Sequence, residues 1–221
     1  MESKLFTPVT FGPLTLRNRT IRSAAFESMC PGNAPSDMLL DYHRSVAAGG
    51  IGMTTVAYAA VTQSGLSFDR QLWMRPEIIP GLRRLTDAIH AEGAAAGIQL
   101  GHCGNMSHKS ICGCMPVGAS SGFNLYSPTF VRGLRADELP EMARAYGRSV
   151  NLAREAGFDS VEIHAGHGYL ISQFLSPSTN HRKDEFGGSL QNRMRFMDMV
   201  MEEVMLSLIH ISEPTRHAQI S

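Results

Sequence analysis

A repeated alternation of short apolar segments and longer amphipathic segments constrains the fold of this chain more than any other feature. The strand-like segments lie at residues 20–23, 52–57, 95–100 and 160–164. Segments with helical spacing of apolar residues follow them at about 36–48, 77–91, 137–156 and 190–205. Strand and helix signals that alternate in this way predict an α/β protein with a parallel sheet.

Two architectures accommodate such units, an open doubly wound sheet and a closed (β/α)8 TIM barrel. Polar, glycine-rich segments follow the strands, including a predicted loop at 101–135, and barrel enzymes place active-site loops there. No G-x-G-x-x-G motif follows the first strand, although a dinucleotide-binding open sheet usually carries one. We therefore predict a TIM barrel, of which this chain holds roughly the first four of eight units.

An N-terminal β-hairpin is predicted before the first unit. Strand-like residues 9–11 and 14–16 flank Gly12-Pro13, a pair typical of tight turns. We expect residues 1–205 to form one domain, the N-terminal half of the barrel.

Composition narrows the classes of partner and compartment. Lys+Arg and Asp+Glu both total 20, so no excess of positive charge is available to neutralise a nucleic acid. The first residues lack the apolar core of a signal peptide, and no window approaches the roughly 20 apolar residues of a membrane span. We expect a cytoplasmic protein with no nucleic acid or membrane partner, and homo-oligomerisation stays open.

Four cysteines are present, at positions 30, 103, 112 and 114. A disulfide framework is not expected in a chain of this size without a secretory signal. Cys112-Gly113-Cys114 has neither the C-x2-C spacing of a metal site nor a second matching pair. We therefore favour free thiols in a loop over a metal site.

The most informative segment for chemistry is 162–169, where the fourth strand ends. His164 and His167 can each donate one imidazole N–H to the same substrate oxygen, which stabilises negative charge developing there. Tyr169, with an ordinary pKa of about 10, stays protonated at neutral pH and can deliver a proton to a carbanion.

The spacing of the two histidines leaves other interpretations open. They could simply satisfy buried polar groups in a turn. They could also bind zinc in a barrel hydrolase, but H-E-x-x-H zinc sites place histidines at i and i+4 on a helix with a glutamate between them. Neither condition holds here, and no third ligand is obvious.

Longer runs of sequence point to one family. They lie at residues 4–8, 16–19, 97–102, 157–170 and 173–193. Together they resemble the old yellow enzyme family of FMN-dependent NAD(P)H oxidoreductases, which includes ene-reductases and 2,4-dienoyl-CoA reductases. The similarity extends from about residue 3 to about residue 205.

The resemblance implies a set of flavin contacts. The residues that would line FMN are Ser23, Ala24, Ala25 and Phe26. Ala57 and Tyr58 would border the isoalloxazine, and Gln99 would hydrogen-bond its pyrimidine edge. The chain departs from the family at two of these positions, because members often have Cys or Thr in place of Phe26 and a small residue in place of Tyr58.

The resemblance also implies a reaction in two halves. NAD(P)H passes a hydride to flavin N5, and the reduced flavin passes it to the β-carbon of an activated alkene. His164 and His167 would hold the electron-withdrawing group of this small-molecule substrate, and Tyr169 would protonate the α-carbon. The cofactor supplies the redox chemistry, and the protein supplies position and polarisation.

Residues 206–221 do not resemble the expected fifth strand. They resemble translated sequencing-adaptor sequence, so we expect a non-native tail; a divergent natural terminus is the alternative. The family binds the FMN phosphate after strands 7 and 8, and an arginine at the end of the fifth strand contacts the flavin; neither lies in the first four units. A second hypothesis is therefore a non-functional or merely associating fragment, whose two open strand edges favour association.

Overall fold

The computed structural model describes residues 3–209. Its main sheet has four parallel strands in the order β3 (Ile21–Arg22), β4 (Met53–Ala60), β5 (Ala95–Gly101) and β9 (Ser160–Ile163). The register pairs Ile21 with Met53, Met53 with Ala95, and Gly97 with Ser160. This order confirms the predicted succession of parallel strand-helix units, and the sheet is a partial barrel.

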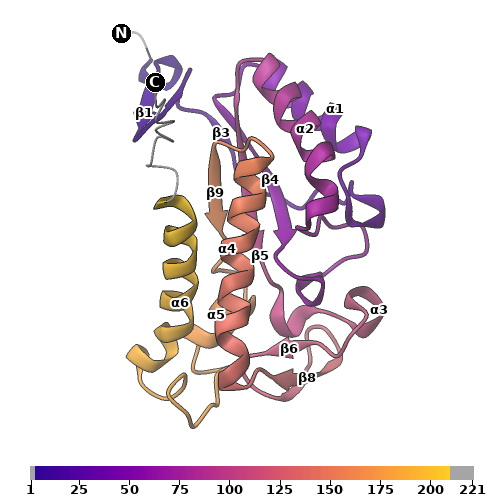
Figure 1. Cartoon of the computed structure of the whole chain (residues 1–221), viewed down its shortest axis with the longest axis vertical. Helices are drawn as coiled ribbons and strands as arrows, with labels where there is room; N and C mark the ends of the chain where they lie inside the picture. Colours follow the sequence, from indigo (N-terminus) through magenta and orange to yellow (C-terminus); the bar gives the residue numbers. More distant parts are fainter. Residues whose placement is uncertain (1–2, 210–221) are drawn as a thin grey trace, which may run out of the picture.

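Helices cover one face of this sheet. They are α1 (Asp37–Ala48), α2 (Ile79–Ala91), α4 (Leu139–Glu155) and α6 (Leu190–Ile209). The first three pack on β4 and β5, and α6 packs beside α4 (Figure 1). On β5 the core residues Ile98 and Leu100 are fully buried, while Gln99 between them projects from the opposite face. Truncating either core side chain to alanine would cost about 2–5 kcal/mol.

The predicted hairpin is confirmed. Strands β1 (Val9–Phe11) and β2 (Leu14–Leu16) pair antiparallel, and Gly12 between them has φ +54°. The hairpin lies at the end of the sheet where the parallel strands begin (Figure 1). Arg17 connects it to the helix ends, because its guanidinium donates to the carbonyls of Ala47 at 2.6 Å and Glu92 at 2.7 Å. Such carbonyls lack partners inside their own helices.

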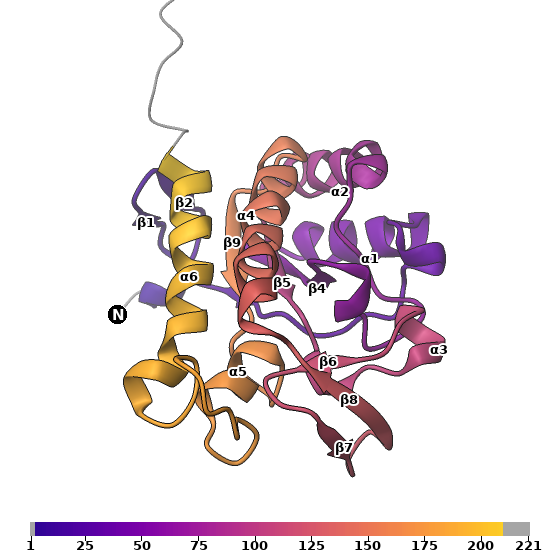
Figure 2. The same cartoon turned by 60° about the horizontal axis from the view of Figure 1, so that its bottom comes forward.

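The predicted loop at 101–135 is wrong in part. It contains α3 (Lys109–Cys112) and the strands β6 (Val117–Gly118), β7 (Gly122–Asn124) and β8 (Thr129–Gly133). These strands form a small sheet in the order β6-β8-β7, beyond the end of β5 (Figure 2). Strands of two to five residues are too short to show a period of two in the sequence.

Helix α6 begins as expected. The Ser189 hydroxyl accepts a hydrogen bond from the Asn192 N–H at 3.3 Å, which caps its first turn. The helix runs to Ile209, so residues 206–209 of the expected tail belong to it, and residues 210–221 lie outside the described residues. Across residues 3–209, we find no helix with the length and apolar character that a bilayer span requires.

Candidate active site

The chain turns sharply after β9 and brings three predicted residues together. His164 directly follows the strand, and its N–H donates to the Leu100 carbonyl at 2.8 Å. His167 and Gly168 then adopt φ of +56° and +70°, a region that non-glycine residues rarely enter. Tyr169 precedes α5 (Leu170–Leu175). The His164 ring centroid consequently lies 5.0 Å from that of His167 and 4.8 Å from that of Tyr169.

The surroundings of His164 and Tyr169 favour the uncharged forms of these two side chains. Burial lowers the pKa of His164, and the neighbouring His167 lowers it further. Burial also raises the pKa of Tyr169. Within residues 3–209 no hydrogen bond occupies a ring nitrogen of His164 or His167. The cluster therefore presents imidazole N–H groups and a protonated phenol to a ligand.

Two more predicted residues, Ala57 and Tyr58, lie in a β-bulge beside this site. Val56 pairs with Ile98, but the next pair is Ala59 with Leu100, so β4 has one extra residue. A bulge of this kind re-aims side chains. Tyr58 points toward the cluster, with its ring centroid 5.3 Å from that of Tyr169, and its hydroxyl donates to the Gly65 carbonyl at 3.0 Å.

Glu27 ties the loop after β3 to this bulge. Its carboxylate accepts a hydrogen bond from the Ala57 N–H at 3.3 Å. It also lies 3.1 Å from the Arg22 guanidinium and 3.3 Å from His43 Nε2, with only 4% of its side chain exposed. Glu27 was not among the predicted site residues, and the only signal for it in the sequence was a carboxylate directly after an apolar run.

The loop after β3 carries the four expected flavin contacts, and only part of this loop packs against the site. Ala24 packs in the same small apolar cluster as Tyr58 and Tyr169. Phe26 stacks on Phe68 with ring centroids 4.6 Å apart. Ser23 and Ala25 are exposed on the loop.

Gln99 lies on the same face of the sheet as the cluster. Its side-chain amide donates to the Glu162 carboxylate at 2.6 Å. Gly101 is the next residue on that face, and a Cβ there would stand 3.0 Å from the Tyr58 ring and 3.1 Å from His164 Cβ. Gln99 is thus one step below the layer that contains Tyr58 and His164.

Gln173 on α5 is a second residue that was not among the predicted site residues. Its side chain is buried, and its amide donates to the carbonyls of Gly168 at 2.7 Å and Cys103 at 3.1 Å. Its amide oxygen accepts from the Asn105 N–H at 3.1 Å. Gln173 therefore holds the turn containing His167 against the segment after β5. The only indication of Gln173 in the sequence was its position four residues, about one helical turn, after Tyr169.

A cavity of about 530 Å³ opens beside His167. Met106, Leu125 and Tyr126 contribute to its lining. Small-molecule sites are typically concave and mostly apolar with a few polar groups. In residues 3–209 no three His, Cys, Asp or Glu side chains are grouped to hold a metal ion, so the zinc alternative gains no support there.

Comparison with known proteins identifies close relatives. Residues 4–208 match the family model described as "NADH:flavin oxidoreductase / NADH oxidase family". A 4,4'-dithiodibutanoate disulfide reductase of Rhodococcus erythropolis is 42% identical over 90% of this chain and 50% of its own length. An NADPH dehydrogenase of Bacillus subtilis is 37% identical over 92% of this chain and 60% of its own length.

Solved structures agree with this result. The old yellow enzyme homologue of Zymomonas mobilis superimposes with a TM-score of 0.87 at 29% identity, covering 93% of this chain and 61% of that one. Morphinone reductase in complex with tetrahydroNAD gives a TM-score of 0.85 at 28% identity, with the same coverage. The chain thus spans about half to three-fifths of the length of these relatives.

Proposed function

Because the chain belongs to the NADH:flavin oxidoreductase / NADH oxidase family, that of the old yellow enzyme, we propose that its site serves FMN-dependent, NAD(P)H-driven reduction of activated C=C bonds. Enones and enoyl-type compounds are the proposed substrates. The observation that carries the proposal is the cluster of His164, His167 and Tyr169, with its unoccupied imidazole nitrogens and protonated phenol. The cavity beside His167 provides room for a small substrate.

The residues on the inner face of the sheet fit a flat, partly polar cofactor. Ala24, Ala57 and Tyr58 form an apolar group beside the catalytic cluster. Gln99 adds an amide that can donate and accept, as the edge of a flavin ring requires. In this proposal these residues hold FMN, with Ser23, Ala25 and Phe26 on the adjoining loop. When bound, FMN supplies the transfer of hydride from NAD(P)H to the alkene.

The protein's own residues then position and polarise the substrate. His164 and His167 donate N–H hydrogen bonds to the oxygen of the electron-withdrawing group. Because burial keeps His164 neutral, it donates without introducing a full positive charge. Tyr169 gives its phenolic proton to the α-carbon, and general acid catalysis of this kind contributes about 10²–10⁴-fold.

Titration of the purified 221-residue chain with FMN tests the first requirement. We expect saturable quenching of flavin fluorescence, a yellow protein after gel filtration, bleaching by NADPH and recovery of colour with an enone. Gln99→Leu should weaken FMN binding, whereas Gln191→Leu, a matched change at an exposed position of α6, should not. Absence of flavin binding would instead support the alternative, a non-functional or associating fragment without the FMN phosphate site.

A second class of electron acceptor should be tested in the same assay. The Rhodococcus erythropolis relative is a disulfide reductase, which suggests an organic disulfide as the oxidant of the reduced flavin. Recovery of colour with 4,4'-dithiodibutanoate but not with an enone would favour that class and overturn the alkene proposal.

A further inference from the structure

Cys112 and Cys114 are held side by side by the left-handed turn between them. Helix α3 ends at Cys112, and Gly113 has φ +73°, with its N–H donating to the Lys109 carbonyl at 2.9 Å. This conformation, favoured by glycine, turns the chain back on itself. The two sulfurs lie 3.7 Å apart, and the Cys112 thiol donates to the Cys114 carbonyl at 3.2 Å.

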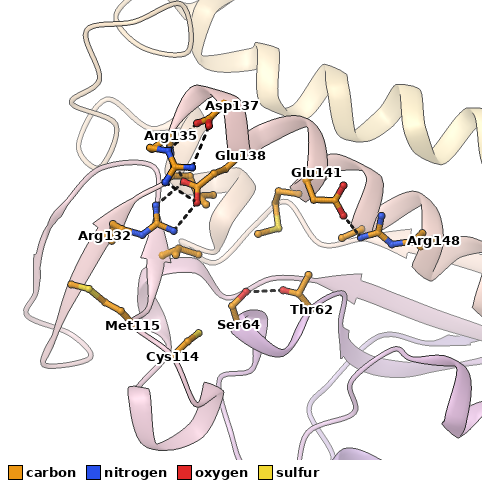
Figure 3. Close-up of a pocket in the computed structure, with 14 residues that line it drawn as sticks. Thr62, Ser64, Cys114, Met115, Arg132, Arg135, Asp137, Glu138, Glu141 and Arg148 are labelled. Carbon is orange, nitrogen blue, oxygen red and sulfur yellow. Dashed lines mark hydrogen bonds and ion pairs between the residues drawn. The ribbon is translucent and has the colours of Figure 1, made fainter.

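The two thiols differ in access. Cys112 is 2% exposed, whereas Cys114 is exposed and lines a cavity of about 590 Å³ together with Ser64, Met115 and Arg132 (Figure 3). An external reagent can therefore react directly with the Cys114 thiol. The buried Cys112 thiol can react only after the reagent has become attached to Cys114. Cys30 and Cys103 are buried elsewhere, and burial raises the pKa of each thiol to about 12.

We propose that Cys112 and Cys114 form a redox-active dithiol site that low-molecular-weight disulfides oxidise to an intramolecular disulfide. The Cys114 thiolate attacks one sulfur of R–S–S–R, which forms a mixed disulfide and releases one R–S⁻ that takes up a proton. The Cys112 sulfur, after losing its proton, then attacks the Cys114 sulfur and releases the second R–S⁻. The protein loses two electrons and two protons, and the external disulfide becomes two thiols.

The geometry suits the second step. A disulfide needs sulfurs about 2.0 Å apart, so the 3.7 Å separation requires a small side-chain adjustment. The attacking and attacked sulfurs already lie within one turn of chain. The mixed disulfide on Cys114 should therefore be short-lived, because its resolving thiol is its immediate neighbour.

The rate should depend strongly on pH. Burial and the adjacent Cys112 raise the pKa of Cys114 to about 11, with Arg132 partly offsetting the rise. Because the thiolate is the attacking species, the oxidation rate should increase about tenfold per pH unit between pH 7 and 9.

The site is independent of the proposed flavin chemistry. The cavity that Cys114 lines does not include His164, His167 or Tyr169 among its lining residues. Oxidation of the dithiol requires neither FMN nor NAD(P)H. Its failure can therefore be distinguished from failure of the proposed function.

Mass spectrometry of the purified 221-residue chain tests the proposal. The reduced chain is incubated anaerobically with oxidised glutathione at pH 8.5, alkylated without reduction and mapped by peptide mass. We expect a Cys112–Cys114 disulfide, lighter by two hydrogen atoms, while Cys30 and Cys103 stay reduced. Persistent glutathione on wild-type Cys114, no modification, or equal reaction of all four thiols would overturn the proposal.

Two variants separate the roles of the sulfurs. Cys112→Ser should trap the mixed disulfide, seen as one added glutathione on Cys114. Cys114→Ser should leave Cys112 unmodified, because that thiol is buried. Rapid modification of Cys112 in the Cys114→Ser chain would contradict the assigned order of attack.

Discussion

The imidazole of His164 meets the phenol of Tyr169 nearly edge-on, with ring centroids 4.8 Å apart and ring planes at 72°. The two residues adjoin different elements, because His164 directly follows strand β9 and Tyr169 directly precedes helix α5. The turn between them contains a histidine with positive φ and is held by the buried Gln173 amide. His167, on the same turn, lines the cavity of about 530 Å³, and its ring centroid lies 5.0 Å from that of His164.

Tyr169→Phe should separate the two half-reactions in FMN-loaded protein. Loss of the phenolic proton should slow alkene reduction by about 10²-fold or more, because general acid catalysis is removed. Flavin reduction by NAD(P)H should stay nearly unchanged in stopped-flow measurements. Tyr146→Phe is the matched control, since the buried Tyr146 hydroxyl has no hydrogen-bond partner in the described residues. Equal loss in both half-reactions would argue against the proton-donor role.

His164→Ala should impair the same half-reaction through lost stabilisation of negative charge. Removing one donor of this type typically costs about 10²–10³-fold in rate. His164→Asn retains an N–H donor of similar reach and should recover part of the loss in steady-state kcat. If His164→Asn and His164→Ala were equally active, hydrogen-bond donation by this ring would not be the cause.

Glu27→Gln should destabilise the fold more than any surface carboxylate change. The substitution neutralises a buried carboxylate that faces Arg22 and His43, and breaking a buried pair costs about 3 kcal/mol. Glu77→Gln provides the control, because the Glu77 side chain is 74% exposed and its 4.0 Å contact with Arg75 is worth less than about 1 kcal/mol. Urea unfolding of both variants measures the difference. Similar midpoints would show that the Glu27 contacts contribute little.

His102 should make the fold sensitive to acid. The ring is fully buried, accepts from the Gly104 N–H at 2.9 Å and contacts the Ser64 hydroxyl at 3.0 Å. Burial lowers its pKa from 6.5 to about 3. Between these values the unfolded chain binds more protons than the folded one, so the stabilisation is complete above pH 6.5 and is lost as the pH falls toward 3.

Urea unfolding between pH 7.5 and pH 4.5 measures this dependence. His102→Gln cannot take up the proton, so its free energy of unfolding should fall less steeply than that of the wild-type chain. The full effect of the wild-type ring, reached only as the pH approaches 3, is on the order of 5 kcal/mol. Parallel slopes for the two proteins would assign the acid sensitivity to other groups.

Local patterns in the sequence were sufficient for the main architecture. Apolar residues with helical spacing and short apolar strands depend only on neighbours along the chain, and they predicted the four units and the Gly12-Pro13 hairpin. The position of His164 at a strand end also followed from local sequence. The family followed from long runs such as 157–170, which the family model confirms over residues 4–208.

Other features were decided by contacts between distant residues. The bulge at Ala57 and Tyr58 exists only in the pairing of β4 with β5, and its free N–H is satisfied by Glu27, 30 positions away. Gln173 forms hydrogen bonds with Cys103 and Asn105, which lie 70 and 68 positions earlier in the chain. The small β6-β8-β7 sheet likewise depends on pairing between strands that are too short to show a period of two in the sequence.

The sequence by itself therefore determined the hairpin and the four main strand-helix units, and it nominated candidate site residues, because hydrophobic spacing and residue type are properties of short segments. Only the tertiary structure decided that Tyr58, His164, His167 and Tyr169 share one cluster and that Cys114 meets Cys112 beside a separate cavity. The physical reason is that desolvation and side-chain proximity arise when segments pack together.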